Sequence, residues 1–421
     1  MLNRRSFMKG LAGAATLGGL TACTGTTTRA RAHVLVIGGG YGGATAAKYL
    51  RMWSQGAVDV TLIERNAAFV SCPMSNLVVG GYRELADISV SYAALQSKWG
   101  VRLITDEATA IDPARRTVST AANGVLSYDR LVLSPGIDFI TTAVPGLEGN
   151  FERLPHAWKA GPQTVLLRQQ LQDMPDGGVF AMHVPKSPYR CPPGPYERAC
   201  VVASYLQRHK PRSKVLVLDA NAEIQSKKAL FTKAFQSYGK LIDYVPNSDL
   251  RSVDATSRSA ELEFDRVRAD VLNVIPPMRA GSIAVRAGLP LVNGRWVDVD
   301  WLTMEAKGVA GVHVLGDALL PAPGMPKSGH MANQHAKLAA AAVLNLLAGE
   351  PPSPTPVLTN TCYSFVDERN AIHVASVHQY DADKRQPMPV EGAGGLSTAA
   401  SDLEGQYAFA WAKNIWADML A

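Results

Sequence analysis

The chain has 421 residues, 47% of them hydrophobic and 19% charged, which is enough for two or three folded domains and argues against wholesale disorder. Its formal charge is +6, but residues 1–32 hold five basic and no acidic side chains, which leaves only +1 for the rest of the chain. That balance argues against a protein that binds nucleic acid through a dominant basic surface.

The N-terminal segment has the features of an export signal. Arg4 and Arg5 are followed by Phe7, Lys9 and the apolar run LAGAATLGGLTA, which is too short to span a bilayer as a mature helix. A twin-arginine pair in this setting predicts a Tat signal peptide over residues 1–32. An ordinary Sec signal with a chance arginine pair is the alternative. In either case we expect a periplasmic protein, in a compartment where disulfides persist.

Two cleavage sites compete in this segment. The sequence LTAC, residues 20–23, resembles a lipoprotein signal-peptidase site, and ARA, residues 30–32, resembles an ordinary A-x-A site. Use of the first site would leave a lipid on Cys23 and make residues 24–32 a tether. We favour soluble export, with lipid anchoring at Cys23 as the open alternative and no stable membrane span in either case.

A dinucleotide-binding motif follows the signal. The segment RAHVLVIGGGYGGATAAKYL predicts a strand, a glycine turn and a helix, with Gly38, Gly40 and Gly43 in the spacing G-x-G-x-x-G. These glycines permit a tight turn, close approach of the backbone to a pyrophosphate, and close packing of helix on strand. A second strand, VDVTLIER, ends at Glu64, where an acid that binds the ribose is expected.

Two later segments favour FAD over NAD as the nucleotide. Residues 128–136 and 312–318 each predict a buried strand that ends in a tight turn, and the second ends at Gly316-Asp317. In two-domain flavoproteins such an aspartate hydrogen-bonds the ribityl chain. A helix is expected near residues 327–349, with its N-terminus directed at the flavin, where it would favour the anionic reduced form.

The middle region, about residues 165–285, predicts a second nucleotide-type fold with strands at 177–185 and 214–220. Its first strand is followed by PKSPYRCPPGPYERA instead of a glycine motif, and the prolines remove backbone donors and stiffen the turn. We therefore expect a Rossmann-like domain whose NAD(P)H site has been replaced; a degraded motif that still binds NADPH is the alternative. After residues 351–356 we expect an antiparallel section, a glycine-rich loop and a C-terminal helix.

The cysteines at positions 23, 72, 191, 200 and 362 show no C-x-x-C spacing and no accompanying histidine cluster, so we expect no metal site. Cys191 follows a strand of the second domain, at the turn where a nicotinamide enzyme would bring its cofactor to the flavin. If Cys191 and Cys362 meet, they form a disulfide over the flavin or a structural staple between domains, and the spacing does not decide between these.

Several motifs together resemble one family over nearly the whole chain. They are GGGYGGATAAKYL, VTLIERN, SCPMSNLVVGG, LPHAWKAGPQT, RCPPGPYERA, GDA followed by MPKSG, NTCYS and YAFAWAKNI, of which RCPPGPYER and NTCYS are the most specific. The chain resembles the flavoprotein subunit of flavocytochrome c sulfide dehydrogenase, including relatives in the sulfur-oxidation system. The resemblance implies an α/β, glutathione-reductase-like fold with two dinucleotide-binding-type domains and a C-terminal α+β domain. The expected segments are an FAD domain of residues 33–160 and 286–350, a second domain of 161–285, and a C-terminal domain of 351–421.

The resemblance also implies the chemistry. Cys72 in SCPMSN matches the cysteine that carries FAD through an 8α-S-cysteinyl bond; without the resemblance, a small buried apolar residue would be an equal reading. Cys191 and Cys362 match a redox-active disulfide beside the flavin. Hydrosulfide would attack one sulfur through a persulfide intermediate, and the released thiolate would donate two electrons to the flavin. The reduced flavin would pass them singly to a c-type haem subunit in a heterodimer.

Three further residues are implied with alternatives. Glu197 in PYER is the candidate acid–base, or a helix-start residue favoured by the helix dipole. Lys327 in MPKSG either adds positive charge near the flavin or faces solvent, and Trp411 in AWAKN is either an aromatic near the flavin or a core tryptophan. Cys200 departs from the family pattern, and we expect a buried free thiol; a strained bond with Cys191 is the alternative.

The sequence and this resemblance therefore predict an exported enzyme that oxidises sulfide with FAD and reduces a c-type cytochrome. The nearest alternative is a sulfide:quinone oxidoreductase, because the C-terminal segment YAFAWAKNIWADMLA is amphipathic. A second alternative is a thiol-exchange partner that keeps another protein of a sulfur-oxidation system active. An NAD(P)H-dependent disulfide reductase is disfavoured by the missing second glycine motif.

Overall fold

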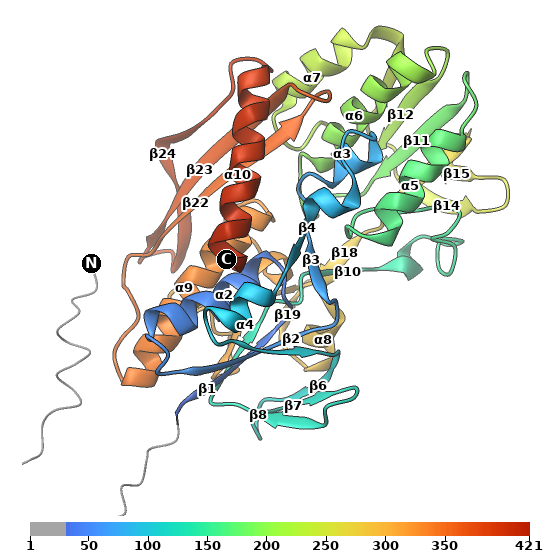
Figure 1. Cartoon of the computed structure of the whole chain (residues 1–421). Helices are drawn as coiled ribbons and strands as arrows, with labels where there is room; N and C mark the ends of the chain where they lie inside the picture. Colours follow the sequence, from blue (N-terminus) through green and yellow to red (C-terminus); the bar gives the residue numbers. More distant parts are fainter. Residues whose placement is uncertain (1–30) are drawn as a thin grey trace, which may run out of the picture. The chain divides into compact units, whose positions relative to one another are not determined.

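The computed structural model describes residues 31–421, and the predictions of a Tat signal and of a lipid on Cys23 lie outside the described residues. Residues 32–421 form one compact unit. Figure 1 shows its elements coloured along the chain. No described helix combines the length and apolar character that crossing a membrane requires.

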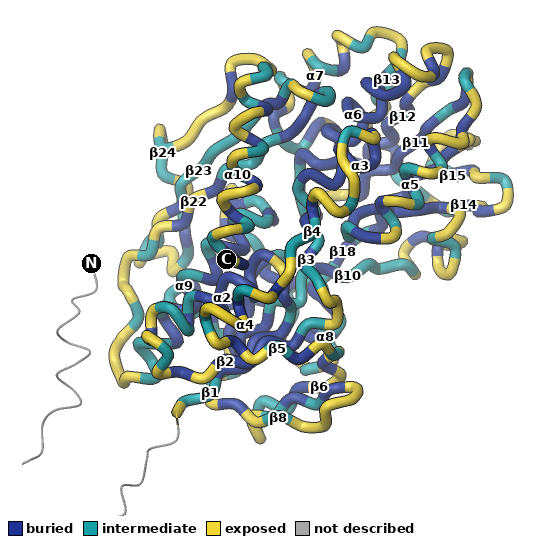
Figure 2. Tube along the Cα trace, viewed as in Figure 1, coloured by how far each residue is buried: buried dark blue, intermediate teal, exposed yellow. Residues whose placement is uncertain are grey.

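The first sheet contains five parallel strands in the order β21-β9-β1-β2-β5. Their bounds are β1 His33–Ile37, β2 Asp59–Glu64, β5 Arg102–Thr105, β9 Arg130–Leu133 and β21 Val312–Val314. Helix α2 (Tyr41–Trp53) follows β1 and packs against α9 (Gly329–Ala348). Both faces of β1 are covered, so its apolar residues are buried without alternation, as Figure 2 shows. The strands predicted at residues 128–136 and 312–318 are confirmed as β9 and β21.

Smaller elements complete this part of the chain. An antiparallel meander is formed by β6 (Ala108–Asp112), β7 (Thr117–Thr120) and β8 (Val125–Ser127). The pairs β3–β4, β10–β18 and β19–β20 are also antiparallel. The remaining bounds are β3 Ala68–Val70, β4 Ser89–Ser91, β10 Ile137–Phe139, β18 Met278–Ala280, β19 Leu291–Val292, β20 Trp296–Val297, α3 Ser75–Val79, α4 Ala93–Ser97 and α8 Ser282–Arg286.

The second sheet is also parallel, in the order β13-β12-β11-β17. Its strands are β11 Val179–Val184, β12 Lys214–Asp219, β13 Ile242–Val245 and β17 Val271–Val274, and its helices are α5 Pro162–Asp173, α6 Gly194–His209 and α7 Lys228–Ser237. Strands β14 (Leu250–Asp254), β15 (Ser259–Leu262) and β16 (Arg266–Arg268) form an antiparallel addition. The strands predicted at 177–185 and 214–220 are confirmed. The chain passes between the two sheets twice, and the exact domain division stays a prediction.

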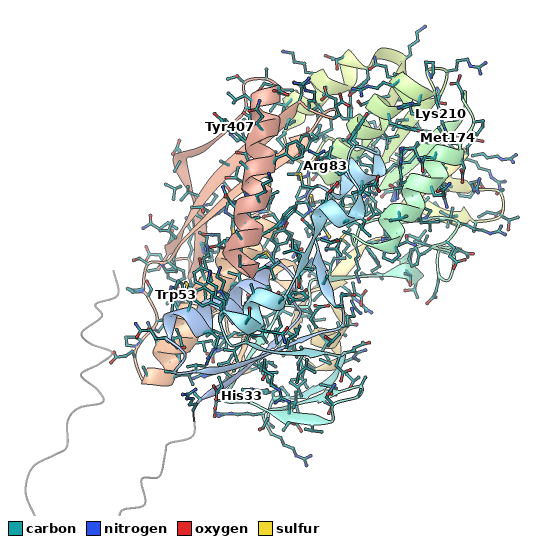
Figure 3. The ribbon with its side chains drawn as sticks, in the orientation of Figure 1. His33, Trp53, Arg83, Met174, Lys210 and Tyr407 are labelled. Carbon is teal, nitrogen blue, oxygen red and sulfur yellow. The ribbon has the colours of Figure 1, made fainter. Side chains whose placement is uncertain are left out.

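A buried lysine closes the end of α5. The ammonium of Lys210 donates to the backbone carbonyls of Leu171, Gln172 and Met174, and Figure 3 shows Lys210 beside Met174. The last carbonyls of a helix have no partner within the helix, so a cation at this end satisfies them and matches the negative end of the dipole. The contact joins α5 to the end of α6, the helix that carries Glu197 and Arg198.

The C-terminal region is an antiparallel sheet with one helix across it (Figure 1). Its strands are β22 Val357–Phe365, β23 Ala371–Asp381 and β24 Gln386–Leu396, and the helix is α10 Asp402–Leu420. The predicted helix is confirmed, but the expected glycine-rich loop is wrong for residues 391–396, which form the end of β24. Backbone pairing with β23 overrides the low strand propensity of glycine there, because β24 is an edge strand with a register shift opposite Ser376 and His378.

Candidate functional site

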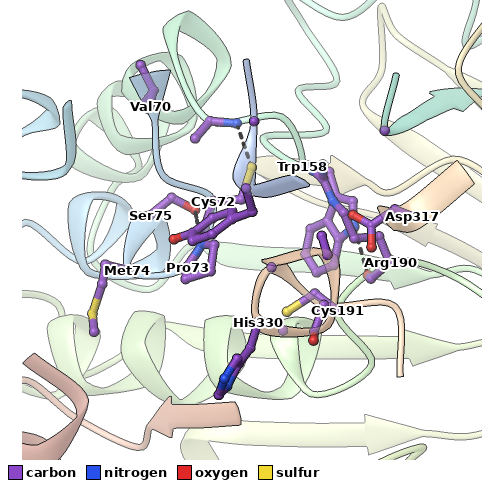
Figure 4. A pocket seen from close by; sticks show the side chains of 18 of the residues that line it. Val70, Cys72, Pro73, Met74, Ser75, Trp158, Arg190, Cys191, Asp317 and His330 are labelled. Carbon is purple, nitrogen blue, oxygen red and sulfur yellow. Dashed lines mark hydrogen bonds between the residues drawn. The ribbon is translucent and has the colours of Figure 1, made fainter. Parts of the chain in front are cut away.

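A cavity of about 350 Å³ lies where the carboxyl ends of β1 and β9 meet the turn before α6, the start of α9 and the end of β22. Ligands of parallel α/β sheets bind at such carboxyl ends, at the point where neighbouring strands connect in opposite directions. Eight of the predicted site residues line this cavity: Gly40, Glu64, Cys72, Cys191, Glu197, Asp317, Cys362 and Trp411. Figure 4 shows several of the side chains on its wall.

The glycine turn forms one end of the cavity. Gly38 has a φ of +92°, a conformation that strongly favours glycine, and a side chain there would overlap the carbonyl oxygen of Ser134. A side chain on Gly43 would overlap the carbonyl of Gly38, so this glycine lets α2 pack against β1. A Cβ on Gly40 would meet nothing within 4 Å. Gly38 and Gly43 therefore shape the turn from behind, and Gly40 leaves its backbone open to a ligand.

Glu64 stands at the end of β2, beside the glycine turn. Its carboxylate accepts hydrogen bonds from the backbone of Gly39 at 2.6 Å and from the side-chain amide of Asn66 at 2.7 Å. The backbone amide of Asn66 donates to the same oxygen as its side chain, Oε1, at 2.8 Å, so these contacts hold the carboxylate at the cavity edge and leave Oε2 able to accept a further hydrogen bond. The position and the remaining acceptor capacity fit a ribose hydroxyl, as the sequence predicts.

Asp317 provides an independent test of the flavin prediction. Its Oδ1 atom is buried and has no hydrogen-bond partner within residues 31–421, although nearly all such buried acceptors are satisfied. Burial raises the pKa of this carboxyl, and the charges of Arg190 and Lys327 act in the opposite direction. A ligand hydroxyl at this point would satisfy the orphaned oxygen. The open turn at Gly40, Glu64 and this acceptor together fit FAD.

Lys327 is buried, so the alternative in which it faces solvent is wrong. Its ammonium donates to the backbone carbonyls of Asp317 and Leu319 and lies 3.6 Å from the ring centre of Trp296. The side chain is thus turned to these groups and is not among the residues that line the main cavity. Burial lowers the pKa of Lys327 to about 7. Its carbonyl oxygen accepts a hydrogen bond from Cys191, which ties it to the reactive loop.

Cys72 lies in the loop between β3 and α3, on the cavity wall (Figure 4). Its sulfur is 3.5 Å from the backbone nitrogen of Ala160, and its carbonyl accepts a hydrogen bond from the hydroxyl of Ser75. The thiol is half-buried and free. It is therefore not a core residue sealed from the cavity, and its position allows a bond to a ligand placed there. Attachment of FAD at Cys72 stays a prediction.

Cys191 occupies the turn that leads into α6. It has a φ of +58°, which is uncommon for a residue with a side chain, and its amide donates to the carbonyl of Lys327 at 2.8 Å. Its own carbonyl accepts a hydrogen bond from Gly194, so the loop holds the sulfur on the cavity wall. Burial raises the pKa of the thiol, and the charges of Glu197 and Cys362 raise it further.

Cys362 reaches the same cavity from β22. Its sulfur lies 3.4 Å from the side-chain nitrogen of Asn360, whose carbonyl oxygen accepts a hydrogen bond from Ser328, the N-cap residue of α9. The structure records Cys191 and Cys362 as free thiols, so no bond joins them here. The fold nevertheless brings them to one cavity from distant parts of the chain. Their pairing as a redox-active disulfide stays a prediction.

Glu197, in the first turn of α6, is buried beside both cysteines. Its carboxylate accepts hydrogen bonds from the backbone of Phe365 at 2.9 Å and from the side-chain amide of Asn76 at 2.9 Å. Burial raises its pKa above the ordinary value, against the effect of these two donors. Its charge raises the pKa of Cys191 and of Cys362. A buried carboxyl with a raised pKa that couples to two thiols is suited to proton transfer.

Arg198 supports Glu197 through Asn76, which accepts a hydrogen bond from Arg198 and donates one to Glu197. Its guanidinium donates to Asn76 Oδ1, to Asn273 Oδ1 and to the carbonyls of His156 and Ala157 at 2.6–3.0 Å. Only 1% of the residue is exposed, and burial lowers its pKa to about 10, so it stays charged at neutral pH. These contacts join α6, the loop before α5 and β17.

Replacing Arg198 by methionine is expected to lower the free energy of unfolding by about 3 kcal/mol, because four buried acceptors lose their donor while the apolar volume is kept. Urea unfolding of the FAD-loaded protein, followed by circular dichroism, measures this. Arg208→Met, which removes an exposed pair with Glu368, is the matched control and should cost less than about 1 kcal/mol. Equal losses in the two variants would contradict this account.

Trp411 on α10 lines the cavity and is not a fully buried core residue. Its ring lies 6.0 Å from that of His330 and 6.4 Å from that of Tyr363, measured between ring centres. This aromatic group closes the cavity on the side of α10. Cys200 lies fully buried as a free thiol on α6 and is not bonded to Cys191, as expected.

Several cavity residues were not predicted from the sequence. Asn76 holds Glu197, Arg190 offsets the charge of Asp317, and the indole of Trp158 donates to the carbonyl of Arg190. Each of these residues belongs to one of the motifs SCPMSN, RCPPGPYER and LPHAWK, so the resemblance in these motifs could have indicated them. His330 and Tyr41 follow glycines that open helices, and only the fold directs them into the cavity.

Comparisons with known proteins identify the family and the fold. Residues 164–276 match the family described as sulfide dehydrogenase (flavocytochrome c) flavoprotein chain, central, and residues 354–420 match flavocytochrome c sulphide dehydrogenase, flavin-binding. Residues 32–168 match pyridine nucleotide-disulphide oxidoreductase. The flavoprotein chain of sulfide dehydrogenase from Chlorobaculum thiosulfatiphilum is 56% identical over 46 residues, which are 11% of this chain and 94% of that one.

Longer matches are found among quinone-linked enzymes. The sulfide-quinone reductase of Aquifex aeolicus is 27% identical over 358 residues, which cover 80% of this chain and 81% of the relative. A solved structure of the sulfide:quinone oxidoreductase from that organism has a TM-score of 0.74 at 20% identity, covering 92% of this chain and 91% of that chain. The putidaredoxin reductase–putidaredoxin complex has a TM-score of 0.65 at 16% identity, covering 91% and 93%. These similarities confirm the predicted fold class.

Proposed function

This chain belongs to the family of flavoprotein chains of flavocytochrome c sulfide dehydrogenase, and on that premise we propose that it oxidises sulfide through Cys191 and Cys362 and delivers the electrons through FAD to a c-type cytochrome. The observation that supports this most directly is the shared cavity. Both cysteines and Glu197 line one space, although they come from distant parts of the sequence. The same space is lined by five of the predicted FAD-binding residues: Gly40, Glu64, Cys72, Asp317 and Trp411.

The oxidised form carries the Cys191–Cys362 disulfide. Hydrosulfide attacks one sulfur, a new S–S bond forms to that cysteine, and the other cysteine leaves with the electron pair of the broken bond as a thiolate. The charge of Glu197 acts on both thiols. Glu197 takes the proton from the outer sulfur of the new hydropersulfide. FAD, when bound, would supply the two-electron oxidation in which the thiolate and the deprotonated outer sulfur join in an S–S bond, and would hand the electron pair on one electron at a time.

The chain's own residues hold the cofactor in place. The turn at Gly40 and the N-terminus of α2 would receive the pyrophosphate, Glu64 would bind the ribose, and Asp317 Oδ1, which has no partner within residues 31–421, would accept from a ribityl hydroxyl. Cys72 would hold the flavin ring through a thioether, and such a bond would raise the flavin potential and prevent loss of the cofactor. Trp411 shields this space on the side of α10.

The electron acceptor needs a separate test, because the relatives that match over most of this chain are named as quinone-linked enzymes. The discriminating experiment mixes the purified protein anaerobically with sulfide and follows flavin bleaching. Oxidised cytochrome c or a soluble quinone is then added, and reoxidation is recorded. We expect bleaching followed by fast reoxidation with cytochrome c. Faster reoxidation by the quinone would assign the chain to the alternative, and no bleaching at millimolar sulfide would favour a thiol-exchange partner.

NAD(P)H is not expected to bleach the flavin. The carboxylate at the end of β12, Asp219, stands where a nicotinamide enzyme binds the adenosine ribose. Here one oxygen accepts hydrogen bonds from the hydroxyls of Tyr196 and Tyr244, and the other accepts them from Asn221. The same assay with NADH and NADPH in place of sulfide tests this point.

We further propose that the protein is exported by the Tat pathway to the periplasm and assembles there with a haem subunit. Support comes from the paired arginines, from the small-residue run of residues 11–22 and from the family. Mass spectrometry of the mature N-terminus distinguishes cleavage after residue 32 from lipid attachment at Cys23. Retention of the uncleaved chain in the cytoplasm would contradict export.

Replacing Glu197 by glutamine is expected to slow flavin bleaching by sulfide about 10²-fold, because the proton acceptor is lost. The same change removes a negative charge that raises the pKa of both cysteines, so their alkylation after reduction should become faster. Since burial raises the pKa of Glu197, the wild-type rate should fall, as pH decreases, at a higher pH than an ordinary carboxyl would give.

The matched control for this prediction is Glu223→Gln, at an exposed glutamate paired with Lys228. Both variants share the pH dependence that comes from ionisation of sulfide itself, so their difference isolates Glu197. Slower bleaching together with slower alkylation of Cys191 and Cys362 would indicate a distorted site and contradict the proton-transfer role.

A further inference from the structure

Lys227 is a buried cation behind the strand that carries Cys362. It precedes α7 directly, and 6% of the residue is exposed. Its ammonium donates to the carbonyl of Cys362 at 2.9 Å, to the hydroxyl of Ser364 at 2.8 Å and to the carbonyl of Ile372 at 3.4 Å. All three contacts are neutral oxygens, and within residues 31–421 no carboxylate lies within ion-pair distance of this ammonium.

The backbone at Lys227 is also held in an unfavourable conformation. Its φ of +54° belongs to the left-handed region, which residues with a side chain rarely adopt. Burying a charge without a counter-ion is costly as well. A residue that combines both costs is maintained by its surroundings, and such positions cluster at functional sites.

Four anionic groups on separate segments act on Lys227. They are the thiolate of Cys362 on β22, then Glu197 on α6, Cys191 in the preceding turn and Glu404 on α10. Burial lowers the pKa of Lys227 to about 8, and these groups raise it in that order. Conversely, burial raises the pKa of Cys362, and Lys227 is the strongest influence that lowers it, ahead of Asn360 and Ser328.

We propose that Lys227 is a positioning residue of the sulfide reaction, which holds Cys362 in place and stabilises negative charge on its sulfur when the disulfide opens. This inference rests on the proposed function of Cys191 and Cys362. Lys227 has no part in the sequence motifs that indicate that function. The direct contact with the backbone of Cys362, and the lack of a carboxylate partner among residues 31–421, carry the inference.

The electron balance of the opening step shows why a cation is needed there. If hydrosulfide attacks Cys191, the new S–S bond forms at Cys191 and Cys362 leaves as a thiolate with the electron pair. If it attacks Cys362, that cysteine keeps the added sulfur as a hydropersulfide, and Cys191 takes the pair; loss of the hydropersulfide proton to Glu197 then leaves an anion on the Cys362 side. In both orders an anionic sulfur lies on the strand that Lys227 contacts.

The test uses the FAD-loaded full chain, reduced anaerobically with a phosphine. Alkylation of Cys362 by iodoacetamide is measured against pH by peptide mass spectrometry. Because only the thiolate reacts, Lys227→Met is expected to slow alkylation at least about tenfold at neutral pH and to move the profile up by about one unit. Lys228→Met, at the exposed neighbour of Lys227, is the matched control and should leave the profile unchanged.

Charge is separated from packing by two further variants. Lys227→Arg keeps the charge and should stay near the wild-type profile, whereas Lys227→Gln keeps hydrogen-bond donors without charge and should follow Lys227→Met. If Lys227→Met does not bind FAD, the alkylation profiles of Lys227→Gln and Lys227→Arg are compared with each other and decide whether charge matters. Equal profiles for Arg and Gln, or an unchanged profile in the neutral variants, would overturn the proposal.

The alkylation readout does not depend on sulfide oxidation. If wild-type protein fails to bleach with sulfide but Lys227→Met still shifts the Cys362 profile, the proposed function fails and the charge role stands. If the wild type bleaches and the profile is unchanged, only the role of Lys227 fails. In the supported case, the bleaching rate of Lys227→Met should also fall, with a larger deficit at lower pH.

Discussion

Replacement of Cys362 by serine is expected to abolish bleaching of the flavin by sulfide, with a loss of at least about 10³-fold in rate. Cys362 and Cys191 line the same cavity, and a hydroxyl cannot form the disulfide that hydrosulfide must open. Stopped-flow absorbance at the flavin maximum under anaerobic conditions measures the rate. Cys191→Ser should show a loss of the same order, because either change leaves no disulfide to open.

The matched control is Cys200→Ala. This thiol is fully buried on α6, close in sequence to Cys191, and the structure records it as free. Its loss should leave bleaching within about twofold, although it removes some packing. A Cys362→Ser protein that bleaches at a rate comparable to that of Cys200→Ala would rule out the disulfide mechanism. If Cys200→Ala were inactive and Cys362→Ser active, the partner of Cys191 would be Cys200 and not Cys362.

Replacement of Cys72 by serine is expected to release the flavin completely on acid precipitation. In the wild type the flavin should remain in the protein pellet, because Cys72 is a free thiol on the cavity wall in the loop that follows β3. A serine hydroxyl does not form the thioether. The variant should still bind FAD, since the turn at Gly40, Glu64 and Asp317 is untouched, and its flavin potential should be lower than in the wild type.

The control for attachment is Cys191→Ser, which removes another thiol of the same cavity. Its pellet should stay yellow after acid treatment, even though its reaction with sulfide is lost. Free flavin in the supernatant of the wild type would contradict covalent attachment. A Cys191→Ser pellet without flavin would show that the flavin is attached to Cys191 and not to Cys72.

Much of the fold could be predicted because its signals are local. The glycine turn is readable from sequence, since Gly38 adopts a positive φ and a side chain on Gly43 would overlap the chain. Strands β9, β11, β12 and β21 are apolar runs of the kind that parallel sheets bury on both faces. The segment at residues 391–396 was predicted wrongly as a loop, because pairing with β23 outweighs the preference of its glycines.

Site residues that belong to a specific sequence motif could be predicted. Site residues that are defined only by their contacts in the folded chain could not. Cys72, Cys191, Glu197 and Cys362 belong to specific motifs, and all four line the cavity. Lys227 belongs to none of them, and its ammonium reaches Cys362 only because α7 begins behind β22. Lys327 could be assigned no environment from sequence, and the structure buries it against Trp296.

By itself the sequence determined the nucleotide turn, the parallel strands and the reactive residue types, because backbone sterics and apolar periodicity act over a few residues. Only the tertiary structure decided which side chains share the cavity, where Glu197 and Lys227 are buried, and that Asp317 keeps an unsatisfied oxygen. Burial and the distance between charges set the pKa values of such groups, and both arise from packing of segments that lie far apart in the chain.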